Sequence, residues 1–174
     1  CLNLTNIVLP DTLVEIKSSA FRYCTGLTTL TLPEGLKSIG DSTFSGCIGL
    51  TNITIPENVT SIGNSAFNYC TGLTSIIIPE SVTSIGDSAF SGCNGLVSIT
   101  LPEGLKTIEK STFMGCINLI SITIPNEVIS IGEAAFSYCT SLTSIKIPKS
   151  VTIIGGSAFS GCNGLVSITL PEGL

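Results

Sequence analysis

The stretch at residues 91–105, SGCNGLVSITLPEGL, returns letter for letter at residues 160–174. The offset between the two copies is three 23-residue periods, and looser copies recur at every single period. Cysteine marks the copies at Cys1, Cys24, Cys47, Cys70, Cys93, Cys116, Cys139 and Cys162. Phenylalanine marks them at Phe21, Phe44, Phe67, Phe90, Phe113, Phe136 and Phe159. Because no copy gains or loses a residue, the repeat predicts coils that stack in register as a solenoid.

Composition favours an ordered chain with a continuous core. Apolar residues make up 43% and charged residues 11% of the 174 residues. Seven full units and a further partial unit fit into this length. We therefore expect residues 1–174 to form a single solenoid domain of about seven and a half repeats. Both ends fall in mid-repeat, so we expect the chain to be a piece of a longer protein without its capping repeats.

Charge and hydropathy exclude two classes of partner. The net charge is −5, and the 7 basic residues are scattered, whereas nucleic-acid binding needs clustered Lys and Arg. Every apolar run is cut within a few residues by Pro, Ser, Thr or Gly, well short of the ~20 residues of a membrane-spanning helix. We expect neither nucleic-acid binding nor a membrane-spanning segment.

Each unit contains a run typical of a short β-strand. Apolar and polar residues alternate before a proline, as in Ile53-Thr54-Ile55 or Ile122-Thr123-Ile124. Alternation predicts that Ile53 and Ile55 point inward while Asn52 and Thr54 point outward. The proline ends the run, since it lacks the N–H that a sheet would use.

After the proline we expect a turn, an extended segment, a corner and a short helical turn. A glycine usually follows the extended segment, as at Gly63 and Gly86, and suits a corner that needs a positive φ or close approach between coils. Residues 87–93, DSAFSGC, have a capping Asp and Ser followed by inward-facing Ala, Phe and Cys, which predicts one helical turn.

The whole unit can be written CxxLxxIxIPxxVxxIGxxAFxx. It resembles the 23-residue leucine-rich repeat of the BspA-like, or Treponema pallidum-type, group, found in surface proteins of bacteria and some parasitic protists. Departures from the pattern are few: Thr43 and Thr112 replace Ala, and Lys17 and Glu109 replace Gly. The resemblance implies a leucine-rich-repeat solenoid, a β-rich α/β arc with a parallel sheet on its concave side. It also implies a secreted or cell-surface protein that adheres to host-matrix proteins or other cells.

The cysteine and phenylalanine ladders predict core packing. Zinc sites use Cys or His at short spacing, whereas each gap here is one full repeat and the chain has no His. Stacked Cβ atoms at the ~4.8 Å strand spacing lie outside the usual ~3.5–4.5 Å of a disulfide. We therefore expect buried free thiols, a Phe spine, no metal and no cofactor.

A row of acids follows the prolines and admits two interpretations. Its members are Asp11, Glu34, Glu57, Glu80, Glu103 and Glu172. Calcium needs 6–8 oxygen ligands, and the row offers about one carboxylate per coil, so a solvated rim is the favoured interpretation. Lys37 and Lys106 lie three residues after Glu34 and Glu103, a spacing that allows a local ion pair worth little at a surface.

The outward strand positions form the candidate binding face. They vary most in chemistry while the frame stays fixed, and solenoids commonly bind through such a sheet. They are Asn6, Val8, Thr29, Thr31, Asn52, Thr54, Ser75, Ile77, Ser98, Thr100, Ser121, Thr123, Ser144, Lys146, Ser167 and Thr169. The same small polar residues also suit a plain solvated strand, so this face alone leaves binding open.

The sequence shows no pattern typical of catalysis, because there is no His, no facing acid pair and no phosphate-binding loop. We expect a non-enzymatic, extracellular module that binds a protein ligand, such as a matrix or host-surface protein, through the concave face. One alternative is a structural spacer or rod that associates end to end. A remote alternative is ice binding by a Thr row, which Ile77 and Lys146 interrupt.

Overall fold

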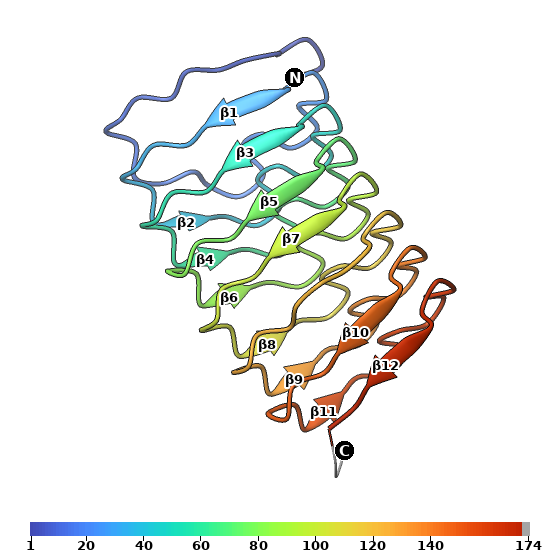
Figure 1. The fold of residues 1–174 in the computed structure, drawn as a ribbon. Helices are drawn as coiled ribbons and strands as arrows, with labels where there is room; N and C mark the ends of the chain where they lie inside the picture. The colour runs from blue at the N-terminus through green and yellow to red at the C-terminus, as the bar shows by residue number, and fades with distance from the viewer. Residues whose placement is uncertain (172–174) are drawn as a thin grey trace.

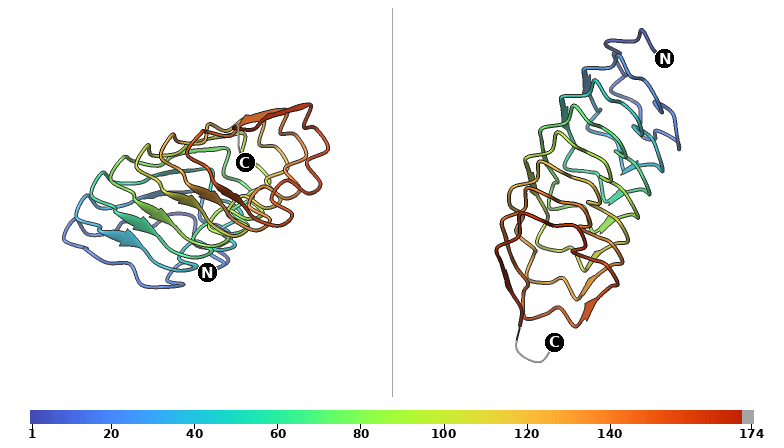
Figure 2. Two further views of the ribbon diagram at one scale, coloured as in Figure 1. Left: turned by 90° about the horizontal axis from the view of Figure 1, so that it is seen from below. Right: turned by 90° about the vertical axis from the view of Figure 1, so that its right-hand side faces the viewer.

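The computed structural model describes residues 1–171 as an elongated stack of coils (Figures 1 and 2). The first and last described coils lie at opposite ends of the stack, and each successive coil lies against the previous one (Figure 1). Most coils cross two separate rows of parallel strands, one of three-residue strands and one of two-residue strands. The fold is thus a β-solenoid built from the 23-residue unit.

The first row consists of three-residue strands in strict register. They are β1 (Thr29–Thr31), β3 (Asn52–Thr54), β5 (Ser75–Ile77), β7 (Ser98–Thr100), β10 (Ser144–Lys146) and β12 (Ser167–Thr169). β1 pairs with β3, β5 with β7 and β10 with β12, all in parallel, and Leu30 lies opposite Ile53. The predicted alternation is confirmed in β3, where Ile53 is buried and Asn52 and Thr54 are exposed. Within residues 1–171, the segment 121–124 follows the same path without strand pairing, contrary to the prediction for that unit.

The second row consists of two-residue strands where the sequence predicted only extended chain. They are β2 (Ser38–Ile39), β4 (Ser61–Ile62), β6 (Ser84–Ile85), β8 (Thr107–Ile108), β9 (Ser130–Ile131) and β11 (Ile153–Ile154). They form two parallel sheets, β2-β4-β6 and β8-β9-β11. Ile39, Ile62 and Ile85 point into the core, so the second row closes the apolar interior from the other side.

The helical turn predicted for residues 87–93 is wrong, and residues 1–171 contain no helix. Ser88 and Gly92 have φ values of 56° and 71°, in the left-handed region. Amide donors alternate here: Ser91 donates to Ser88 O within the coil, whereas Phe90 donates to Thr112 O in the next coil. A helix would direct every amide to its own segment. Carbonyls of the next coil instead accept every second backbone N–H of this segment, and the segment forms a row of turns.

The recurrent corner glycines serve close approach between coils. A Cβ on Gly86 would lie 2.7 Å from the backbone nitrogen of Asn64 and 2.9 Å from the carbonyl carbon of Gly63. Gly40, Gly63, Gly132 and Gly155 face the preceding coil in the same way, at 3.0 Å or less. The positive φ values lie elsewhere, at the Ser88 and Gly92 positions and their equivalents. The prediction of close approach is therefore confirmed, and the alternative of a positive φ at these corners is wrong.

The interior is one continuous apolar cluster. Its spine is a stack of seven Phe rings with centroids 5.3–5.8 Å apart and planes within 19° of parallel. Phe44 to Phe136 are fully buried, while Phe21 and Phe159 are partly exposed. The predicted Phe spine is confirmed. Because every coil contributes the same side chains at the same depth, the strands outside this core are held at fixed positions.

Candidate binding face

All sixteen outward positions predicted as a binding face are exposed. We define the strand face as these residues: the outer side chains of the three-residue strands together with Asn6, Val8, Ser121 and Thr123. Parallel register brings side chains that are one repeat apart into columns, for example Thr29 beside Asn52 and Thr31 beside Thr54. The structure therefore gathers side chains distant in sequence onto one surface.

The strand face carries Ser or Thr at eleven positions and Asn at two, Asn6 and Asn52, and the three remaining side chains distinguish individual coils. Val8 and Ile77 are large aliphatic side chains with 89% and 72% of their surface exposed. Lys146 is the one cation among the sixteen positions. The face is thus chemically uneven along the solenoid, although the backbone that carries it repeats.

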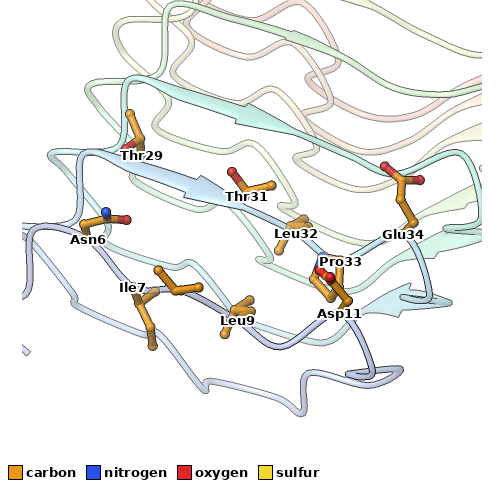
Figure 3. Close-up of a pocket in the computed structure, with 10 residues that line it drawn as sticks. Asn6, Ile7, Leu9, Asp11, Thr29, Thr31, Leu32, Pro33 and Glu34 are labelled. Atoms are coloured by element: carbon orange, nitrogen blue, oxygen red, sulfur yellow. The ribbon is translucent and has the colours of Figure 1, made fainter.

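Four shallow hollows lie along the strand face, between the strands and the proline bends that follow them. The first, about 420 Å³, is lined by side chains that include Asp11, Thr31 and Glu34 (Figure 3), and also by Val8. The second, about 290 Å³, lies between the strands β3 and β5 and includes Ile77. Two more, of about 150 and 320 Å³, follow around Thr123. Together they form an interrupted groove that runs across the coils.

The acidic row forms one rim of this groove. Asp11, Glu34, Glu57 and Glu103 line the first three hollows. Glu103 donates its backbone N–H to the Glu80 carboxylate at 2.9 Å. Such a bond between coils helps to hold the carboxylate in place. Glu172, the last member of the predicted row, lies outside the described residues.

The ion pairs of the described residues join neighbouring coils, and the local pairs that the spacing allows do not form. In residues 1–171, Lys106 pairs with Glu127 of the next coil, and Lys110 pairs with Glu133 at 2.9 Å. Neither the Glu34–Lys37 nor the Glu103–Lys106 pair forms in this part of the chain. Partners one coil away are closer than partners three residues along the turn. Among the described residues, no three acidic or sulfur ligands come together as a metal site.

The cysteines are free thiols that also donate hydrogen bonds. Cys24 to Cys139 are buried, as predicted, while Cys162 is partly exposed and Cys1 is exposed. From Cys47 onward, each Sγ donates to the carbonyl of the Phe in the preceding coil, at 3.0–3.2 Å. Burial raises the pKa of the Cys47 thiol from 9.0 to about 11. Burial likewise raises the pKa of the Cys93 thiol well above 9.0. Both thiols therefore stay protonated at neutral pH.

The tyrosines that precede a cysteine, for which the sequence favours edge packing, do pack between coils, but their glycine partners were not predicted although the signal was present in the sequence. Tyr23, Tyr69 and Tyr138 are more than half exposed, and their rings lie over Gly46, Gly92 and Gly161 of the next coil. Each of these residues has a positive φ. The sequence signal is that every Tyr directly before a Cys is followed by a Gly one repeat later.

The parallel strand rows, the leucine-bearing unit and the fixed 23-residue register define a leucine-rich-repeat solenoid. The profile of the family described as "BspA type Leucine rich repeat region (6 copies)" matches residues 1–114 and 62–174, which together span the chain. The chain belongs to this BspA-type leucine-rich-repeat family.

Three solved structures illustrate the similarity. A leucine-rich repeat protein from Bacteroides ovatus is 34% identical, with a TM-score of 0.65, covering 94% of this chain and 54% of that one. The T. pallidum leucine-rich repeat protein is 31% identical, with a TM-score of 0.66 and coverage of 97% and 71%. A leucine-rich cell surface protein from Faecalibacterium prausnitzii is 29% identical, with a TM-score of 0.57 and coverage of 92% and 64%.

The chain spans about half the length of the Bacteroides ovatus protein. Comparison with curated proteins gives no match. Within residues 1–171, no helix is long and apolar enough to cross a membrane.

Proposed function

We propose that this chain is a non-catalytic module that binds a protein ligand through the strand face. The observation that supports it is the array of sixteen exposed side chains on register-locked strands, beside a groove of hollows. Leucine-rich-repeat proteins generally mediate protein interactions, and on this face Val8, Ile77 and Lys146 distinguish individual coils. Because the strands are already ordered, binding would cost little conformational entropy, and many weak contacts can add up.

We infer a location at the cell surface or outside the cell. The Faecalibacterium prausnitzii relative is described as a cell surface protein. We propose a ligand on a host cell or in the extracellular matrix, so that the function would be adhesion. The face lacks Trp, Tyr and Arg, the residues that usually dominate interface energies, so we expect affinity to come from contact over several coils.

The test compares two variants with the same number and type of substitutions. The first changes Thr54, Ile77, Thr100 and Thr123 on the strand face to Glu. The second changes Thr60, Thr83, Ile129 and Thr152, which are exposed and lie beside the two-residue strands, to Glu. Both are measured with the parent chain against a panel of matrix and host-surface proteins, after circular dichroism confirms that they are folded.

We expect saturable binding by the parent and the second variant, and loss of binding by the first. Equal loss in both variants would move the site away from the strand face. If none of the three binds any ligand and light scattering shows concentration-dependent growth of the parent, the chain is instead a spacer or a self-associating rod.

A further inference from the structure

We propose that the groove on the strand face takes an extended polypeptide segment that carries Lys or Arg and runs along the solenoid axis. This inference rests on the proposed function and names the class of partner. Its support is an acidic rim along the first three hollows, together with an exposed aliphatic side chain in each of the first two.

The rim is acidic in the first three hollows and neutral at the fourth, where a lysine of the strand face adds positive charge. Asp11 and Glu34 line the first hollow, Glu57 the second and Glu103 the third. In the fourth hollow the equivalent rim residue is Asn126, and Lys146 lies beside it. A cationic segment is therefore favoured over the first three hollows and disfavoured over the fourth.

The floor offers apolar area between the carboxylates. Val8 lines the first hollow and Ile77 the second, and both are largely exposed in the free chain. Removing such side chains from water on binding is favourable in proportion to the area covered. An occupant with alternating basic and aliphatic residues would match both the rim and the floor, since successive side chains of an extended chain point to opposite sides.

The strand face supplies no positive charge that would offset the acidic rim over the first three hollows. From Asn6 to Thr123, every outward position of the face is uncharged. Lys37 and Lys106 lie three residues beyond the rim, and Lys106 is paired with Glu127. Lys149 follows the fourth hollow, next to its buried Pro148, and extends the basic end. The groove thus has an acidic part and a basic end, which would orient its occupant.

The length of the acidic part sets the length of the segment. Asp11 to Glu103 spans four coil steps, or roughly 20 Å at the ~4.8 Å spacing of paired strands. An extended peptide rises ~3.3 Å per residue, so about six residues would cover it. A short linear segment is sufficient, and no folded partner is required.

The experiment measures binding of fluorescein-labelled peptides to the 174-residue chain by fluorescence anisotropy. The probe is an eight-residue peptide of alternating Lys and Val, and its controls replace Lys by Glu or by Ser. The groove variant combines Glu34→Gln, Glu57→Gln and Glu103→Gln. The matched variant combines Glu15→Gln, Asp87→Asn and Glu133→Gln, which removes three exposed carboxylates outside the four hollows of the strand face.

We expect saturable binding of the Lys-Val peptide and none of the Glu-Val peptide. Exposed ion pairs contribute about two- to fivefold each, so the groove variant should bind roughly 10- to 100-fold more weakly, and the matched variant within twofold of the parent. Raising NaCl from 20 to 300 mM should weaken binding to the parent more than to the groove variant.

Equal weakening of both variants, or equal binding of the Ser-Val peptide, would overturn the proposal, because attraction would then be nonspecific or purely apolar. Absence of binding to the Lys-Val peptide would overturn it as well. The protein panel tests the proposed function separately from the peptide proposal. If a panel protein binds the parent but not the variant with Thr54, Ile77, Thr100 and Thr123 changed to Glu, the strand face is a binding site even if the Lys-Val peptide does not bind. Its partner would then have a different chemistry.

Discussion

The ring of Tyr69 lies over Gly92 of the next coil, with Cδ1 2.6 Å from the point where a Cβ on Gly92 would be. Tyr69 and Gly92 have φ values of 55° and 71°, so both positions lie in the left-handed region. Glycine adopts this region without the clash that other residues incur. The tyrosine is tolerated in one coil only where the next coil leaves room for its ring.

This contact makes the cost of Gly92→Ala depend on Tyr69. Gly92→Ala should lower the free energy of unfolding by about 1 kcal/mol for the left-handed backbone, plus a further 1–3 kcal/mol for overpacking against the ring. Gly115→Ala is the control, because its φ is 73° but its Cβ would meet only backbone atoms of Gly92, at 3.8 Å. Urea unfolding of the single variants and of Tyr69→Gly with Gly92→Ala checks this. If the loss of unfolding free energy in the double variant equals the sum of the losses in the two single variants, Tyr69 and Gly92 do not interact.

The Phe spine predicts a dependence on position within the stack. Phe90 is fully buried between Phe67 and Phe113, with centroids 5.3 and 5.8 Å away. Phe90→Ala should cost about 3–5 kcal/mol of unfolding free energy, because it leaves a cavity and removes both stacking contacts. Phe159→Ala, at a partly exposed position, should cost about half as much. Denaturant titrations that give less than about 1 kcal/mol for Phe90→Ala would show that this ring does not support the core.

The buried thiols predict that stability falls at alkaline pH. Burial raises the pKa of the Cys93 thiol well above 9.0. Its protonated form thus stabilises the fold fully below pH 9, and that contribution declines as the unfolded thiol ionises at higher pH. Each such thiol should contribute a loss of about 1.4 kcal/mol per pH unit above pH 9, until the folded thiol also ionises.

Cys93→Ala tests this sign. At pH 7.5 the variant should be less stable than the parent, because it loses packing and the hydrogen bond to Phe67 O. By pH 10.5 the difference should shrink by about 2 kcal/mol, since the variant has one fewer ionising thiol. Val82→Ala, another buried truncation, should keep a constant difference from pH 7.5 to 10.5. Parallel profiles for Cys93→Ala and the parent would mean that the thiol is not desolvated.

Close approach at the corners predicts intolerance of any side chain there. Gly86→Ala would place a Cβ within 2.7 Å of the backbone of the preceding coil, which cannot rotate away. We expect a loss of at least about 1–3 kcal/mol and weakened pairing of β4 with β6, measured by amide hydrogen exchange of Ser84 and Ile85. Gly104→Ala is the control, because no atom lies within 4 Å of its Cβ position. It should be neutral or stabilising by about 0.4–1 kcal/mol.

The repeat period was sufficient to predict the stacking register, because a 23-residue offset returns each side chain to the same depth. Alternation likewise predicted which way Ile53 and Thr54 point. The segment 87–93 could not be predicted in this way, since buried Ala89, Phe90 and Cys93 suit either a helical turn or a row of turns. The hydrogen bonds that favour turns over a helix are donated to carbonyls of residues 110–114 in the next coil. The sequence of a single unit does not reveal these bonds.

The candidate site was predictable in position but not in shape. Alternation located the sixteen outward residues, and all are exposed. The first two hollows are each lined by residues of two neighbouring coils, so one unit of sequence does not predict them. The Lys106 pair shows the same limit: its partner Glu127 belongs to the next repeat in sequence and is adjacent in space.

The ordering of Tyr and Gly along the stack constrains how such a gene can change in length. Tandem duplication of the unit that carries Tyr69 would bring two tyrosines into neighbouring coils, where the second would meet the first ring. Duplication of the unit that carries Gly92 is harmless, and Gly115 follows it directly. A step of three repeats is also harmless, because it carries Tyr69 and Gly92 together onto Tyr138 and Gly161. Insertions that keep each Tyr followed by Gly in the next coil are therefore compatible with this packing, whereas those that place Tyr in two neighbouring coils are not.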